Sequence, residues 1–247
     1  MTMLIIEGRN AVLEALRADV PIKRVLIAEG TKPDRSLDEV ARRASAAGAE
    51  VLHVPRRGLD AKSERGAHQG VLAEAAPFRF ASLDDVLAAA KGKESSLVIA
   101  LDHVTDPGNL GAIVRTAEVV GADGVLIAKR RSAAVTPAAY KSSAGALAHA
   151  RLAQEANLAN SLERCKDAGF WIAGASEHAE RTVWEAPLSG RIVLVMGSEG
   201  EGLARLTQER CDFLVRLPQA GKVGSLNVAQ ATTAIAYEWL RQGTVAS

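Results

Sequence analysis

Short apolar runs alternate with helical spacings in the first third of the chain. Apolar positions three and four residues apart predict helices over 9–18 and 36–48. Apolar runs bounded by polar residues, glycine or proline predict strands over 24–29, 50–55 and 70–75. The pattern therefore predicts a small α/β domain over residues 1–76.

Residues 77–96 differ from what precedes them. The stretch begins with a proline, contains one short helix that opens at Ser82, and ends in polar residues. This composition predicts a linker over 77–96, followed by a second domain over 97–247.

The second domain has more hydrophobic strands, and helices alternate with them. The predicted strands cover 97–102, 124–128, 170–175, 191–197 and 212–218, and the predicted helices lie near 109–120, 158–168, 202–210 and 227–241. Such alternation is typical of a mostly parallel sheet with helices on both faces. In these sheets ligands bind at the carboxyl ends of the strands.

Composition supports an α/β fold but does not show whether the protein binds nucleic acid. Hydrophobic residues make up 48% and aromatic residues 4%, so the core must consist of Ala, Val, Leu and Ile. The chain has 30 basic and 29 acidic residues, which is less basic than many dedicated nucleic-acid binders. Basic groups at Lys23-Arg24, Arg56-Arg57 and 129–131 are either solvated surface or phosphate contacts.

Two cysteines without a C-x-x-C pair suggest a reducing compartment. No apolar run approaches the ~18 residues of a membrane span, so we expect no membrane association and a cytoplasmic location. The five histidines show no metal-ligand spacing, and we therefore expect no metal.

Three polar clusters follow predicted strands. In residues 101–122, Asn109 is either a helix cap or a ligand residue, and Arg115 makes either a surface ion pair or a substrate contact. Residues 193–203 form either a glycine-rich turn or a loop that lets the backbone approach a ligand. In residues 213–231, Ser225 is either a plain helix cap or part of a site. His103 is either a general base or an ordinary loop histidine.

Together and in this order, the clusters resemble the three motifs of the SpoU/TrmH branch of SPOUT RNA methyltransferases. The matching stretches are "DPGNLGAIVRTAEVVGADGVLI", "VLVMGSEGEGL" and "LPQAGKVGSLNVAQATTAIAYE". Two further stretches, "IIEGRNAVLEAL" and "GAHQGVLA", resemble the N-terminal substrate-binding domain of family members that act on ribosomal RNA. The resemblance covers nearly the whole chain and is strongest to members that methylate a guanosine in 23S ribosomal RNA.

The resemblance implies a trefoil-knotted SPOUT methyltransferase domain behind a smaller L30e-like α/β domain. It implies S-adenosylmethionine as cofactor, large-subunit ribosomal RNA as substrate and a homodimer, with the helices near 109–120 and 227–241 at the contact and Tyr237 and Trp239 as candidate anchors. Carried over by position, the catalytic residues are Asn109, Arg115, Glu199, Ser225 and Asn227, and the cofactor-binding residues are Gly197, Leu217 and Leu226.

Three other functions remain open. The same reaction at a different ribosomal or transfer RNA site needs the same motifs. A non-catalytic RNA-binding assembly protein on this fold would be expected to lose the polar residues, and here all five are kept. A nucleotide-dependent enzyme using the glycine loop is disfavoured, because a phosphate-binding lysine is missing and Glu199 and Glu201 would repel a phosphate.

Overall fold

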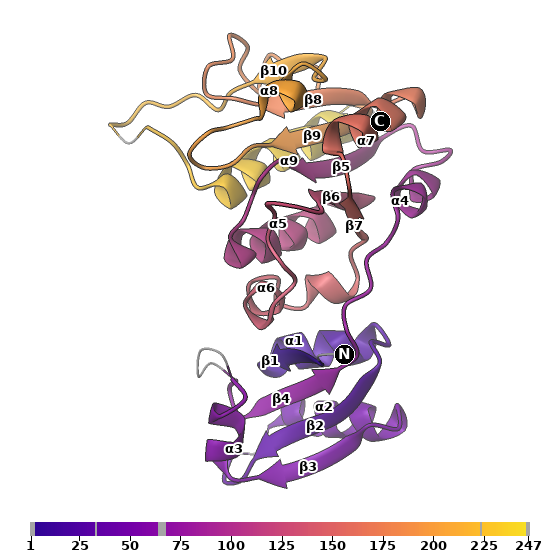
Figure 1. Ribbon diagram of the computed structural model, residues 1–247, viewed down its shortest axis with the longest axis vertical. Coiled ribbons are helices and arrows are strands. Elements are labelled where there is room, and N and C mark those ends of the chain that lie inside the picture. Colours follow the sequence, from indigo (N-terminus) through magenta and orange to yellow (C-terminus); the bar gives the residue numbers. More distant parts are fainter. Residues whose placement is uncertain (1–2, 33, 64–67, 223, 246–247) are drawn as a thin grey trace. The chain divides into compact units, whose positions relative to one another are not determined.

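The chain folds into two units. The computed structural model describes residues 3–32, 34–63, 68–222 and 224–245. Internal contacts divide the chain into a first unit, Met1–Arg79 with Ala134–His149, and a second unit, Phe80–Ala133 with Ala150–Ser247 (Figure 1). Each unit has its own sheet, so the α/β class predicted from the sequence is confirmed.

A four-stranded mixed sheet, in the order β1-β4-β2-β3, forms the first unit. Strand β4 (Val71–Ala75) runs antiparallel to β1 (Leu4–Glu7) and β2 (Ile22–Ala28), whereas β2 and β3 (Glu50–Val54) are parallel. The helices are α1 (Arg9–Arg17), α2 (Arg35–Ala46) and α3 (Arg56–Asp60). The predicted strands and helices of this unit are confirmed. The pattern does not predict β1 and α3, because 4 and 5 residues are too few to show a period.

Residues 134–149 belong to the first unit, although the sequence boundaries assign them to the second domain. They contain α6 (Pro137–Ser142) and a 3-10 turn (Ala146–Ala148), and α6 packs on β1. Tyr140 is 1% exposed, and its ring forms a T-shaped pair with that of Phe78, with the centroids 6.3 Å apart. The predicted domain boundary differs from the observed one because residues 134–149 are rich in alanine and show no hydrophobic periodicity. Their sequence therefore does not indicate which unit buries them.

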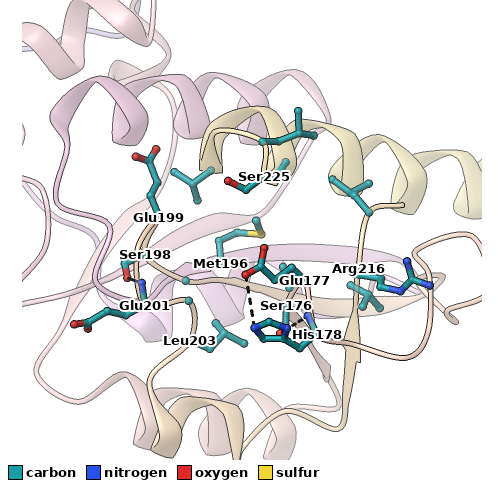
Figure 2. A pocket seen from close by; sticks show the side chains of 18 of the residues that line it. Ser176, Glu177, His178, Met196, Ser198, Glu199, Glu201, Leu203, Arg216 and Ser225 are labelled. Atoms are coloured by element: carbon teal, nitrogen blue, oxygen red, sulfur yellow. Dashed lines mark hydrogen bonds and ion pairs between the residues drawn. The ribbon is translucent and has the colours of Figure 1, made fainter. Parts of the chain in front are cut away.

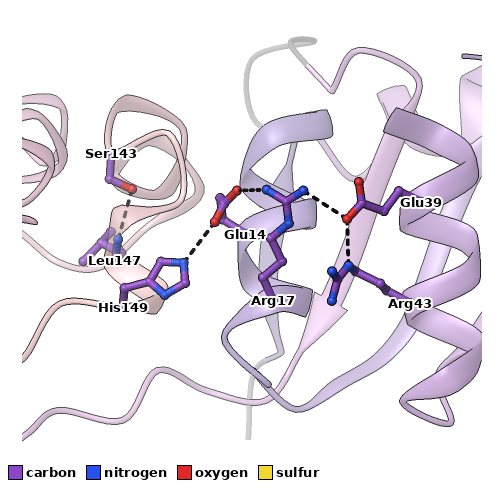
Figure 3. A network of polar contacts seen from close by, with 7 residues as sticks. All are labelled: Glu14, Arg17, Glu39, Arg43, Ser143, Leu147 and His149. Carbon is purple, nitrogen blue, oxygen red and sulfur yellow. Dashed lines mark hydrogen bonds and ion pairs between the residues drawn. The ribbon is translucent and has the colours of Figure 1, made fainter. Parts of the chain in front are cut away.

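Polar contacts tie residues 134–149 to α1, and α1 in turn to α2 (Figure 3). His149 Nε2 lies 3.0 Å from Glu14 Oε2, and Arg17 donates to Glu14 at 2.7 Å and to Glu39 at 3.0 Å. Arg43 also donates to Glu39, at 2.8 Å. Hydrogen bonds from Arg43 and Arg17 hold the pKa of Glu39 below its usual value. The arginines of this network are therefore already paired with carboxylates.

A six-stranded parallel sheet, in the order β10-β8-β9-β5-β6-β7, forms the second unit. The strands are β5 (Ser96–Leu101), β6 (Gly124–Ala128), β7 (Leu152–Glu155), β8 (Trp171–Ala175), β9 (Arg191–Met196) and β10 (Phe213–Val215). The helices are α4 (Leu83–Ala89), α5 (Pro107–Val119), α7 (Leu158–Asp167), α8 (Arg205–Gln208) and α9 (Val228–Val245). The parallel sheet predicted from the sequence is confirmed.

Helices cover both faces of this sheet. Leu83 of α4 and Leu162 of α7 pack with Val98 and Leu126 in one core cluster. Helices α5 and α9 pack together on the opposite face (Figure 1). The strands all run the same way, so the loops after β5, β8, β9 and β10 gather at one edge. Within the described residues, every helix is too short or too polar to cross a lipid bilayer.

Candidate active site

A cavity of about 320 Å³ opens at the carboxyl ends of β8, β9 and β10. Its wall includes the strand ends at Ala175, Met196 and Val215, the loop after β9, and Val228 in the first turn of α9 (Figure 2). The volume lies at the lower end of the range of about 300–1,000 Å³ that is usual for small-molecule sites. The cavity therefore has the size and the position expected of a ligand site in a parallel sheet.

The loop after β9 closes on itself. Ser198 and Gly202 each donate a backbone N–H to the other's carbonyl at 3.0 Å, and Glu201 N donates to Ser198 Oγ at 3.2 Å. A Cβ placed on Gly197 would clash with the backbone of Gly202 and Leu203. Glycine is thus required at position 197 by the loop's own backbone, in addition to lining the cavity.

Gly197→Ala is expected to cost about 2 kcal/mol, because backbone rather than a flexible side chain must move. For a chain of this size the melting temperature should fall by about 4–8 °C. Gly200→Ala is the matched control, since nothing lies within 4 Å of a Cβ at that position. Thermal unfolding of both variants is the measurement. Equal melting temperatures would show that the loop accommodates a side chain at position 197.

Three side chains from three separate segments meet at the edge of the cavity. Asn109 Nδ2 donates to Glu199 Oε1 at 2.7 Å. Asn227 Nδ2 donates to the same oxygen at 2.8 Å and to Asn109 Oδ1 at 2.9 Å. Two amide donors therefore fix the position of one carboxylate. The structure brings together these three residues, which the family resemblance selects.

Asp106 caps α5, and Asn109 does not. The Asp106 carboxylate accepts a hydrogen bond from Asn109 N at 2.7 Å, which is the contact expected of a capping residue. The alternative in which Asn109 serves as the cap is therefore wrong. Its side chain is left available for Glu199.

Asn227 caps α9, and Ser225 does not. Asn227 Oδ1 accepts from Ala229 N at 2.9 Å, which leaves its Nδ2 for the network with Glu199. The plain-cap interpretation of Ser225 is therefore wrong. Ser225 and Leu226 line the cavity instead, as does Leu217.

A buried carboxylate fixes the glycine loop to the end of β5. Asp102 is 2% exposed, its Oδ2 accepts from Ala204 N at 2.7 Å, and its Oδ1 lies 2.6 Å from His103 Nδ1. His103 has a φ of 61°, an uncommon conformation for a residue other than glycine. Since Asp102 binds both His103 and the loop, we assign it a positioning role, connecting the first cluster to the second.

Arg115 lies apart from this network. It is exposed on α5, six residues beyond Asn109 and thus about 9 Å farther along the helix axis. Among the residues that the structure describes, its guanidinium has no hydrogen-bond or ion-pair partner, so of the two alternatives for Arg115 the surface ion pair is not found. A single chain therefore gathers Asn109, Glu199 and Asn227 beside Ser225 but leaves Arg115 outside.

The cavity wall carries more negative than positive charge. Glu177, Glu199 and Glu201 line it, whereas Arg216 is its one arginine, and Figure 2 shows Glu199 and Glu201 pointing in different directions. Apolar side chains such as Met196 complete the wall. This combination suits a ligand with apolar surface and positive charge, and it disfavours a polyphosphate.

The segment after β8 also contributes to the cavity, although it belongs to none of the three polar clusters. Ser176, Glu177 and His178 all line the wall. Their position directly after a predicted strand was the signal available for finding them. Across the described residues, no group of three or more His, Cys, Asp or Glu side chains is placed to hold a metal ion.

Two family models match the chain. The model of the SpoU rRNA Methylase family matches residues 96–237. The model described as RNA 2′-O ribose methyltransferase substrate binding matches residues 5–81. The first match contains all the residues of the network and the glycine loop, and the second lies almost entirely in the first unit.

Similar proteins extend over nearly the whole chain. An uncharacterized tRNA/rRNA methyltransferase of Mycolicibacterium vanbaalenii is 43% identical over 96% of this chain and 76% of its own length. The SpoU methyltransferase AviRb from Streptomyces viridochromogenes, solved with AdoMet, has a TM-score of 0.82 at 27% identity, over 97% of this chain and 90% of its own. An AdoMet-bound rRNA methyltransferase from Sinorhizobium meliloti has a TM-score of 0.81 at 27% identity, over 97% and 87% of the two chains.

Proposed function

Because the chain belongs to the SpoU rRNA Methylase family, we propose that it transfers a methyl group from S-adenosylmethionine to a ribose 2′-hydroxyl of ribosomal RNA. One observation carries the proposal. A small-molecule cavity adjoins a network in which Glu199 is held by Asn109 and Asn227, and the Asn227 side chain is exposed. A bound cofactor and an RNA strand approaching from solvent can thus both reach these groups.

The cavity fits S-adenosylmethionine in charge and chemistry. Its carboxylates favour a cationic ligand, and its apolar side chains favour a heterocycle. The AdoMet-bound relatives support this choice. We assign Gly197, Leu217 and Leu226 to cofactor binding, since all three line the cavity. When bound, S-adenosylmethionine supplies an electrophilic methyl group on a sulfonium, for a displacement that requires alignment but no metal.

The chain's own residues must aim a poor nucleophile and accept its developing charge. We assign Arg115 to the 2′-oxygen, where a guanidinium stabilises negative charge as the hydroxyl proton passes to solvent water at this exposed edge. Asn109 and Asn227 orient the reacting groups, and Glu199 holds both amides and favours positive charge on the cofactor side. Ser225, on the cavity wall, completes the polar set.

Arg115 is exposed on α5 and lies outside the network of its own chain. This position supports a homodimer through α5 and α9, because a second copy docked there can complete the site. On these two helices Val119 is 63% exposed and Tyr237 is 48% exposed, each about one turn beyond the hydrogen bond between Thr116 and Thr233. Trp239 was the wrong anchor, because it is 7% exposed and donates from Nε1 to Gly190 O at 3.1 Å. Light scattering at micromolar concentration tests the dimer, and a monomeric mass would count against it.

The finer assignments remain proposals. The target is a guanosine in 23S ribosomal RNA, and another ribosomal or transfer RNA nucleotide is the alternative. The trefoil knot, the L30e-like character of the first unit and the cytoplasmic location remain predictions based on the resemblance and on composition.

Mapping 2′-O-methylation across ribosomal and transfer RNA, in cells with and without the gene, tests the function. We expect one nucleotide of 23S ribosomal RNA to lose its methyl group when the gene is deleted and to regain it on complementation. A changed transfer RNA nucleotide would redirect the substrate. An unchanged map, together with no cofactor binding by calorimetry, would favour a non-catalytic RNA-binding protein.

A further inference from the structure

A second cavity lies wholly within the first unit. Its volume is about 620 Å³, and three basic side chains, Arg9, Lys32 and Arg56, line it together with Gly30 and Gly70. These residues come from the start of α1, the loop after β2, the start of α3 and the turn before β4. We call this feature the basic cavity.

Buried groups hold one side of the basic cavity in place. His68 is fully buried, its Nδ1 accepts from Gly70 N at 3.0 Å, and its Nε2 lies 2.9 Å from Asp60 Oδ1. A Cβ on Gly70 would clash with Thr31, so the two cavity loops touch closely. The neighbouring Gln69 has a φ of 52°, which turns the backbone sharply. The shape of the cavity is thus built into the fold.

The basic cavity has an excess of positive charge. Arg9 donates from Nε to Gln69 O at 3.1 Å and forms an ion pair with Asp34. The Asp34 carboxylate also caps α2, accepting from Ser36 N and Leu37 N at 2.9 Å each. Lys32 and Arg56 are exposed, and within the described part of the chain neither forms an ion pair. The cavity therefore has three cationic side chains and one neighbouring carboxylate, Asp34, which is already bound to Arg9 and to the start of α2.

Two other basic residues of the first unit are already engaged. Arg24 and Lys62 both pair with Glu74, at 2.6 and 2.8 Å. Burial acts to raise the pKa of Glu74, but the hydrogen bonds and charges of Lys62 and Arg24 hold it below its usual value. Arg56 also belongs to a basic group of the sequence, and of these three residues only Arg56 lines the basic cavity. Arg24 and Lys62 are thus held by Glu74, whereas Arg56 lines the basic cavity.

We propose that the basic cavity binds a backbone phosphate segment of the RNA substrate. The inference deepens the proposed function and rests on it. Cations and a polar loop backbone are the groups that bind RNA phosphates, whereas sequence-specific contacts use aromatic side chains that stack on bases. Among the described residues that line the cavity, none has an aromatic side chain. The cavity thus contributes affinity and position, and it does not select the nucleotide.

The test compares two double variants of the full chain. Lys32→Ala/Arg56→Ala removes two cations from the cavity, and Lys23→Ala/Arg42→Ala removes two exposed cations of the same unit that do not line it. Binding to 23S ribosomal RNA transcribed in vitro is measured by filter retention from 50 to 300 mM salt. For the cavity variant we expect affinity about tenfold weaker and a salt slope shallower by about 1.4, from roughly 0.7 per lost phosphate contact.

The control variant should bind like the wild type. Arg56→Lys should keep the wild-type salt slope, because it keeps the charge that a phosphate requires. A cavity variant whose affinity and slope match those of the control overturns the proposal, as does a loss shown equally by both double variants. Methyl transfer by the wild type is assayed separately on the same RNA. If transfer fails, the proposed function fails for that substrate, while the salt slope still decides whether the cavity binds phosphate.

Discussion

Replacing Arg115 with alanine is expected to lower methyl transfer about a thousandfold, the loss typical of removing one group that stabilises transition-state charge. Binding of S-adenosylmethionine should stay within about threefold of wild type, because Arg115 does not line the cavity. Arg115 is exposed and has no partner among the described residues, so its removal should barely change stability. A tritiated-methyl transfer assay and calorimetry measure the two effects separately.

Two further variants sharpen the test. Arg115→Lys keeps the charge but loses the planar guanidinium, so it should recover only part of the activity. Lys91→Ala removes an exposed cation of the same unit that lies outside α5 and α9, and it should retain full transfer. Undiminished transfer by Arg115→Ala would remove this residue from the catalytic set. An equal loss of cofactor binding would place it at the cavity instead.

Sequence could predict the edge of the sheet at which the site lies, because the carboxyl ends of parallel strands meet there. It could not predict how each polar side chain is used. Asn109 and Asn227 occupy similar helix starts, yet Asn227 is a cap and Asn109 is not. The difference depends on Asp106, which takes the cap of α5 and frees the amide of Asn109. Periodicity carries no information of this kind.

Elements were predictable where they were long and apolar. Strand β7 was not predicted, since it has 4 residues and ends in Gln154 and Glu155. The Trp239 side chain is a second case in which the sequence pattern did not predict the structure. Its sequence position suits an interface anchor, but its indole N–H finds Gly190 O inside the unit. Both β7 and the Trp239 side chain are fixed by contacts with residues distant in the sequence, and the local sequence does not specify these contacts.

The division into two units determines which truncated chains can fold. A chain that begins at Ser95 lacks α4, whose Leu83 and Val86 are 1% and 0% exposed in the core of the second unit. Losing two such side chains removes about 3–6 kcal/mol of apolar burial, which is comparable to the stability of a whole domain. A chain that begins at Phe80 keeps α4, but it leaves Tyr140 and Leu147 without the first unit that buries them.

We therefore expect three truncated chains to behave differently. The positions of the three polar clusters alone predict a folded chain from Ser95, but the loss of α4 should leave that chain largely unfolded. The chain from Phe80 should fold but aggregate through residues 134–149. The chain from Phe80 with 134–149 replaced by a short glycine-serine linker should fold, bind S-adenosylmethionine within a few-fold of the full chain, and lose nearly all transfer to RNA. Circular dichroism, light scattering, calorimetry and the transfer assay distinguish these outcomes.

The loss of transfer in the linker variant follows from where the phosphate-binding groups lie. Without the first unit the chain keeps the cavity at the ends of β8, β9 and β10 and the network of Asn109, Glu199 and Asn227. It lacks the basic cavity with Lys32 and Arg56. Its residual RNA binding should therefore depend less steeply on salt than that of the full chain. Transfer at the full-length rate would show that the second unit recognises the RNA unaided. A stable, monomeric chain from Ser95 would show that α4 is dispensable to the core.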